Sequence, residues 1–79
     1  MYIDVRSKNK YLLGHINDAI NIDYYELFFN YEKYLQKNKK YYIYCDTGTK
    51  SKILVNRLRG LGYNCVNIEG GYNNYLVNK

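Results

Sequence analysis

Short apolar segments alternate with segments of helical periodicity along this chain, and that alternation restricts the fold more than any other feature of the sequence. The apolar segments are rich in tyrosine, isoleucine and valine, residues that favour strands. Strands are predicted at residues 2–5, 19–22, 41–45 and 65–68. Because helical segments separate them, we expect a three-layer α/β fold whose sheet is mainly parallel.

The helical segments differ in length. They occupy part of residues 6–15, all of 24–37, the stretch from Lys50 to Gly60 or Gly62, and a short segment after the glycine turn near the C-terminus. The first holds a single turn, which we expect Gly14 to end in a left-handed conformation. In the second, apolar residues recur every three or four positions, which is typical of one amphipathic helix or two short ones.

The composition is that of one small domain, which we place over residues 1–79. With 47% apolar and 24% charged residues among 79, and no Pro- or Ser-rich linker, neither disorder nor several domains is indicated. Twelve Lys and Arg against seven Asp and Glu give a net charge of +5, which favours small anions or acidic partners. No basic stripe or nucleic-acid motif accompanies that charge, so we expect no nucleic-acid partner.

Membrane and metal functions lack their usual sequence signals. No stretch approaches the roughly 20 apolar residues that span a bilayer, and no basic region precedes an apolar run at the N-terminus. We therefore expect no membrane association and a cytoplasmic location. Cys45 and Cys65 are too few for a disulfide framework and lack metal-site spacing, and His15 is the single histidine. We expect free thiols, no metal and no organic cofactor.

The segment YCDTGTKS, residues 44–51, ends a predicted buried strand and leads directly into a helix. In parallel α/β sheets, ligands bind at the carboxyl ends of the strands, where Cys45 lies. The amides of Asp46–Lys50 and the helix N-terminus should converge on its sulfur and stabilise a thiolate, a persulfide or an oxyanion. Gly48 permits the tight turn, and Lys50 can add positive charge at the rim. A buried packing role for Cys45 also stays open.

Three ordered segments resemble motifs of the rhodanese family of sulfurtransferases. They are IDVRSKNKYLLGHINDAINI from Ile3, YYIYCDTGTKS from Tyr41 and LGYNCVNIEGGYNNYL from Leu61. The resemblance implies a thiosulfate sulfurtransferase-type module. In such a module a persulfide on Cys45 carries sulfane sulfur from a small anionic donor, such as thiosulfate, to a thiol or cyanide acceptor. It also implies a donor site formed by Asp46, Thr47, Gly48, Thr49, Lys50 and Arg6.

The N-terminus departs from the family pattern, which usually places another strand and a short helix before its Asp-Val-Arg motif. Here that motif begins at Asp4, three residues after Met1. The chain is therefore interpreted as a natural minimal form, a truncated product or a piece of a longer protein. Because an edge element would be missing, we expect self-association or a partner chain that supplies the edge.

Two other function classes stay open. A catalytically silent rhodanese-like interaction module fits the same motifs. A related phosphatase or arsenate reductase would carry an arginine six positions after the cysteine, where this chain has Ser51.

Structural interpretations also stand beside the functional ones. Cys65 is interpreted as a core residue of its strand, and His15 as a hydrogen-bonded turn residue. Asp4 and Arg6 are interpreted as a brace between loops, with Arg6 also a candidate for the anion site.

Overall fold

The computed structural model describes residues 1–78 and contains a sheet of parallel strands in the order β2-β1-β3-β4. The strands are β1 (Tyr2–Asp4), β2 (Ile20–Asn21), β3 (Lys40–Tyr44) and β4 (Asn64–Asn67). In β1, Ile3 lies opposite Ile20 on one side and Ile43 on the other. Each predicted strand is found within one residue of its expected ends, and the predicted parallel α/β fold is confirmed.

A helix follows each of these strands along the chain. They are α1 (Lys8–Leu13), α2 (Tyr24–Asn30), the 3-10 turn η1 (Tyr31–Lys33), α3 (Thr49–Gly60) and α4 (Gly71–Val77). The segment 24–37 therefore forms two short helices, one of the two expected arrangements. Asp23 begins α2 by accepting backbone N–H groups on its side chain. Beyond the end of α3, Gly62 takes a left-handed φ of +97°.

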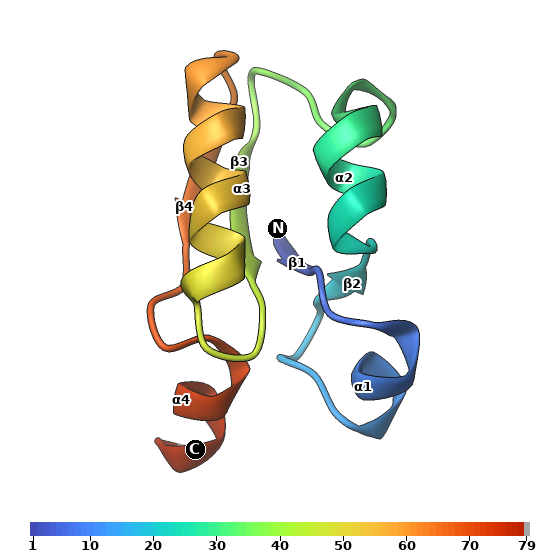
Figure 1. Cartoon of the computed structure of the whole chain (residues 1–79), viewed down its shortest axis with the longest axis vertical. Helices are drawn as coiled ribbons and strands as arrows, with labels where there is room; N and C mark the ends of the chain where they lie inside the picture. Colours follow the sequence, from blue (N-terminus) through green and yellow to red (C-terminus); the bar gives the residue numbers. More distant parts are fainter. Residues whose placement is uncertain (79) are drawn as a thin grey trace.

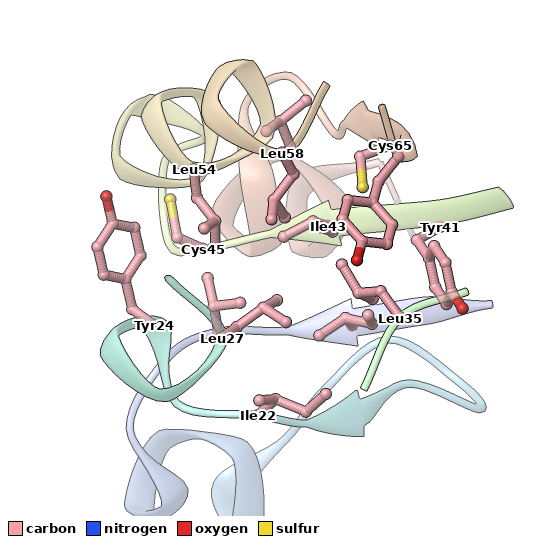
Figure 2. Close-up of a cluster of buried hydrophobic side chains, with 14 residues drawn as sticks. Ile22, Tyr24, Leu27, Leu35, Tyr41, Ile43, Cys45, Leu54, Leu58 and Cys65 are labelled. Carbon is pink, nitrogen blue, oxygen red and sulfur yellow. The ribbon is translucent and has the colours of Figure 1, made fainter. Parts of the chain in front are cut away.

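Figure 1 shows α2 and α3 next to each other in the upper half of the view, with α1 and α4 in the lower half. The main core lies between the sheet and the pair α2 and α3. Its fully buried aliphatic side chains are Ile3, Leu27, Ile43, Leu54 and Leu58. Figure 2 shows the two leucines of α3 directed toward Ile43 of β3. Burial of each such aliphatic side chain contributes about 1.5–3 kcal/mol to the stability of the fold, so packing in this core holds α3 against the sheet.

A smaller core occupies the other face of the sheet. Tyr44 of β3 packs there with Ile16 and Ala19, and Tyr72 and Tyr75 of α4 pack against them. The two faces follow from the alternation of side chains along a strand, since Ile43 points to one core and Tyr44 to the other. Helical elements thus cover both faces, as the predicted three-layer fold requires.

Gly14 ends α1, but the expected left-handed conformation is wrong. Its φ of 160° and ψ of 142° are extended backbone that any residue can adopt. A Cβ at this position would lie 2.5 Å from the hydroxyl oxygen of Tyr72. Close packing between α1 and α4, rather than turn geometry, therefore accounts for glycine here.

The loops that follow β1 and β3 leave the sheet at the same end, the carboxyl end of its strands, because β1 and β3 are parallel neighbours. One more hydrogen bond joins the two segments after the last paired residue of β1: the amide of Val5 donates to the carbonyl of Tyr44 at 3.0 Å. Arg6 and Cys45, the next residues of the two loops, consequently lie at one end of the sheet.

Within residues 1–78, no helix combines the length and the apolar character that crossing a membrane requires. The same residues contain no group of three or more His, Cys, Asp or Glu side chains arranged to hold a metal ion.

Candidate active site around Cys45

The sulfur of Cys45 receives two backbone hydrogen bonds. The amide of Gly48 donates to Sγ over 3.2 Å and the amide of Ser51 over 3.3 Å. Both amides belong to the loop and first turn of α3, which begins at Thr49, so the sulfur lies at the N-terminal end of that helix. Amides directed at one atom stabilise negative charge on it. The geometry favours an anionic sulfur at this position.

These contacts lower the pKa of the Cys45 thiol below its ordinary value of 9.0. Burial is the strongest single influence and acts in the opposite direction, because surroundings of low polarity disfavour a thiolate. The side chain of Ser51, and the backbone of Ser51, Thr47 and Gly48, favour the thiolate and together outweigh the burial. Cys45 is therefore more readily ionised than an isolated cysteine.

Ser51 is fully buried and connects the cysteine loop to β4. Its hydroxyl lies 2.5 Å from Oδ1 of Asn67 and 3.3 Å from the carbonyl oxygen of Gly48. The side-chain amide of Asn67 donates to that carbonyl over 3.0 Å. The sequence marks Ser51 only as the residue in place of an arginine, and it gives no sign that Asn67 belongs to the site. No local pattern joins two residues 16 positions apart.

Glycine is required where this loop meets the turn before α4. Gly48 has a φ of +88°, and a Cβ there would lie 2.9 Å from a backbone nitrogen of that turn. Gly71 has a φ of +58°, and a Cβ there would overlap the carbonyl oxygens of Cys45 and Asp46. The first turn of α4 donates backbone N–H groups to the same two carbonyls. Direct backbone contact therefore fixes the loop on α4.

Cys45 borders a pocket of about 240 Å³ that is walled by the loops after β1 and β3 and by the starts of α1 and α2. The charged side chains that line it are Arg6, Lys10, Asp23, Asp46 and Lys50. Three are cations and two are carboxylates. A pocket of this size and charge suits a small anion.

The guanidinium of Arg6 lines the pocket but bonds mainly to protein groups. Its Nε and Nη2 donate to the buried carboxylate of Asp4, with the closest contact 2.7 Å from Nη2 to Oδ2. Nη2 also donates to the carbonyl of Gly14 over 2.7 Å, and Asp4 accepts the hydroxyl of Tyr44 over 2.8 Å. The predicted brace between Asp4 and Arg6 is confirmed. A role for Arg6 in donor binding stays a prediction.

The carboxylate of Asp46 faces two of the cations. Lys10 Nζ donates to Oδ2 over 2.7 Å, and Arg6 Nη1 lies 3.9 Å from Oδ1. A carboxylate next to a thiolate is unfavourable unless cations offset it. Lys10, which no sequence pattern places at the site, is therefore part of it through its ion pair with Asp46.

The ammonium of Lys50 lies over two aromatic rings. Its Nζ is 4.6 Å from the centroid of the Tyr24 ring and 4.8 Å from that of Tyr25. Figure 2 shows the Tyr24 ring beside Cys45 at one end of the main core. Lys50 is thus found at the pocket, as predicted, but neither tyrosine was expected there.

Three of the predicted donor-site residues, Thr47, Gly48 and Thr49, lie outside the pocket lining. Thr49 donates its amide to the hydroxyl oxygen of Thr47 over 3.5 Å, a local contact at the start of α3. The structure thus brings Cys45, Asp46, Lys50 and Arg6 around one pocket, while Gly48 contributes its amide to the sulfur. Donor binding by any of these residues stays a prediction.

Cys65 and His15 have the structural surroundings that the sequence indicated. Cys65 is buried in β4, where burial raises the pKa of its thiol to about 11. His15 stacks on the ring of Tyr11 at a centroid distance of 3.8 Å, and its Nδ1 lies 2.9 Å from the carbonyl oxygen of the same residue. Within the described residues 1–78, Cys65 lacks the amide contacts that make Cys45 a candidate nucleophile.

Known proteins are similar to this chain in sequence and in fold. A family model described as Rhodanese-like domain matches residues 1–78. The adenylyltransferase and sulfurtransferase uba4 of Ogataea parapolymorpha is 34% identical over 70 residues, which cover 87% of this chain and 18% of that relative. The chain therefore spans about a fifth of that relative's length.

Solved structures agree with the family match. A rhodanese-related protein from Thermoplasma volcanium has a TM-score of 0.88 and 35% identity, over 98% of this chain and 76% of that one. A rhodanese-like domain protein from Staphylococcus aureus has a TM-score of 0.79 and 34% identity, over 89% of this chain and 68% of that one. From this match and the shared fold, the chain belongs to the rhodanese-like domain family.

Proposed function

We propose that the chain is a sulfurtransferase whose Cys45 takes sulfane sulfur from a small anionic donor, such as thiosulfate, and passes it to a thiol or cyanide acceptor. The observation that carries the proposal is the pair of amides directed at Sγ, at 3.2 and 3.3 Å, beside a pocket lined by cations. Membership of the rhodanese-like family, and the similarity to a protein named as a sulfurtransferase, support the same chemistry.

The first step of the reaction loads the enzyme. The Cys45 thiolate attacks the outer sulfur of thiosulfate, and a new S–S bond forms on Cys45. The S–S bond of thiosulfate breaks at the same time, and sulfite leaves with the bonding electron pair. The product is a persulfide whose negative outer sulfur remains close to the loop amides, which stabilise anions.

The second step returns the enzyme to its starting state. Cyanide or a thiolate attacks the outer sulfur of the persulfide, and the bond to Cys45 breaks. Thiocyanate or a new persulfide leaves, and the bonding electron pair stays on the Cys45 thiolate. Neither step transfers a proton once the thiolate exists, so the lowered pKa of Cys45 serves the whole cycle.

Intact-mass analysis after treatment with thiosulfate tests this proposal. We expect one added sulfur atom, located on the peptide that contains Cys45 and absent from the peptide that contains Cys65. Cyanide should then remove it as thiocyanate. Cys45→Ser should abolish both the adduct and turnover, whereas Cys65→Ser should keep them.

Three outcomes would contradict the mechanism. Sulfur on Cys65 would place the chemistry at the wrong thiol. Turnover by a folded Cys45→Ser variant would remove Cys45 from the reaction. A folded wild-type chain that forms no adduct would favour the silent interaction module.

A further inference from the structure

Lys50 differs from the other cations of the pocket in its contacts. Arg6 is ion-paired with Asp4, and Lys10 is ion-paired with Asp46. Among residues 1–78, no carboxylate lies within 4.0 Å of the Lys50 ammonium. Its positive charge is therefore not offset by a neighbouring carboxylate, and it is the one most available to an anion in the pocket.

Two tyrosines of α2 hold that ammonium. Tyr24 and Tyr25 occupy the first turn of α2, and their rings meet nearly edge to face at 5.1 Å. The Lys50 ammonium lies 4.6 and 4.8 Å from the two centroids, within the range of cation–π attraction. Tyr24 is buried in the main core, whereas Tyr25 is 58% exposed. Tyr25 can therefore be replaced without opening the core.

An aromatic ring holds a cation without cancelling its charge. A carboxylate would neutralise the ammonium, but a ring offers only the partial negative charge of its face. A lysine side chain has many rotamers, and two carboxylates, Asp23 and Asp46, line the same pocket. Without a ring beside it, the Lys50 ammonium could move to one of them, and the pocket would lose its available positive charge.

We propose that Tyr25 is a positioning residue that acts through Lys50: its ring, together with that of Tyr24, keeps the ammonium at the pocket and unpaired, and so sets the preference of the Cys45 site for anionic reagents. This inference rests on the proposed function, in which the anionic reagent is the sulfur donor. The charge at the pocket can nevertheless be measured without any sulfur transfer.

The test compares alkylation of Cys45 by iodoacetate, an anion, and iodoacetamide, its neutral analogue of similar size. Both reagents attack the same thiolate, so changes in its pKa or exposure largely cancel in the ratio of the two rates. Rates are taken from the peptide that contains Cys45. The variants are Tyr25→Leu, Tyr25→Phe, Lys50→Met and the double variant Tyr25→Leu/Lys50→Met. Phe29→Leu is the control, because Phe29 is an exposed aromatic residue of α2 outside the pocket lining.

We expect Tyr25→Leu to lower the iodoacetate-to-iodoacetamide ratio about two- to fivefold, the range of an exposed cation–π contact. Tyr25→Phe should keep the wild-type ratio, because phenylalanine retains the ring face. Lys50→Met should lower the ratio at least as much as Tyr25→Leu does. Adding Tyr25→Leu to Lys50→Met should change nothing further, since the ring then has no ammonium to hold. Phe29→Leu should match the wild type.

An unchanged ratio in Tyr25→Leu would overturn the proposal, and so would a ratio in Tyr25→Phe as low as in Tyr25→Leu. An equal loss from Tyr25→Leu with and without Lys50 would show that the ring does not act through the ammonium. If thiosulfate is used, Tyr25→Leu should raise KM for the donor and leave kcat nearly unchanged. A chain that transfers no sulfur but shows the expected ratios refutes the proposed function and leaves the role of Tyr25 supported.

Discussion

Lys10 of α1 donates to the carboxylate of Asp46 over 2.7 Å, and so joins that helix to the residue that directly follows Cys45. Arg6 approaches the other carboxylate oxygen at 3.9 Å. A carboxylate without these cations would raise the pKa of a neighbouring thiol and repel an anionic donor. The ion pair therefore lets the loop contain an aspartate beside its nucleophile.

Lys10→Met should weaken the use of an anionic donor. We expect KM for thiosulfate to rise about two- to fivefold, since the Asp46 charge is no longer offset on that side. Stability should change by less than about 1 kcal/mol, because the pair is exposed. Initial rates against thiosulfate concentration measure the effect. Asp46→Asn in the same background should return KM toward the wild type, and a wild-type KM in Lys10→Met alone would refute this role.

Ser51→Ala should raise the pKa of Cys45, because the hydroxyl of Ser51 favours the thiolate. The rise should be partial, since the amides of Gly48 and Ser51 remain. Stability should fall by about 1 kcal/mol, because Oδ1 of Asn67 loses its donor. The pH profile of Cys45 alkylation and a urea titration measure the two effects.

Ile16→Val is the stability-matched control for that variant. Ile16 is buried in the smaller core and lies outside the lining of the Cys45 pocket, and the loss of one methyl group should cost about 0.5–1.5 kcal/mol. The alkylation profile of Cys45 should therefore not move. A similar pH shift in both variants would mean that lost stability, rather than the Ser51 hydroxyl, changes the thiol.

Gly71→Ala and Gly60→Ala should have opposite effects on stability. A Cβ on Gly71 would strike the carbonyl oxygens of Cys45 and Asp46 at a positive φ, so we expect a loss of at least about 2 kcal/mol. A Cβ on Gly60, at the end of α3, meets no atom of the described residues within 4 Å, and alanine there should gain up to about 1 kcal/mol. Urea midpoints measure both. A neutral Gly71→Ala would show that the loop and α4 are not held as closely as described.

Cys65 should make the protein less stable in alkaline solution. Its pKa is raised by burial to about 11 from an ordinary 9.0, so between these values the folded chain keeps a proton that the unfolded chain has lost. This contribution to stability is full below the unfolded pKa and is lost as the pH rises through the folded one. Urea unfolding over the alkaline range measures it.

Cys65→Ala is the comparison for the alkaline prediction. Its absolute stability should be lower because alanine leaves a cavity, but its stability should fall less steeply with rising pH. Cys45 contributes with the opposite sign, because its pKa is lowered and its contribution is full only above the unfolded pKa. An unchanged pH slope in Cys65→Ala would refute the assignment to this thiol.

The sequence by itself determined the order of strands and helices, the parallel sheet and the loop that carries Cys45. These depend on local properties: periods of two and of three to four residues separate strands from helices, and Gly48 alone permits the positive φ of the turn. The convergence of amides on the sulfur was predictable for the same reason, because a loop that ends a strand and begins a helix turns its N–H groups to one point.

The tertiary structure decided which distant side chains complete the site. The contacts of Asn67 with Ser51, of Lys10 with Asp46 and of Tyr24 with Lys50 join residues of different elements. They follow from the strand order and from how α1 and α2 pack at the carboxyl end of the sheet. Gly14 is a further example: glycine is needed there because Tyr72 packs against it, and not because of the backbone conformation of its turn. Contact between residues far apart in sequence depends on packing of the whole chain, which no local pattern contains.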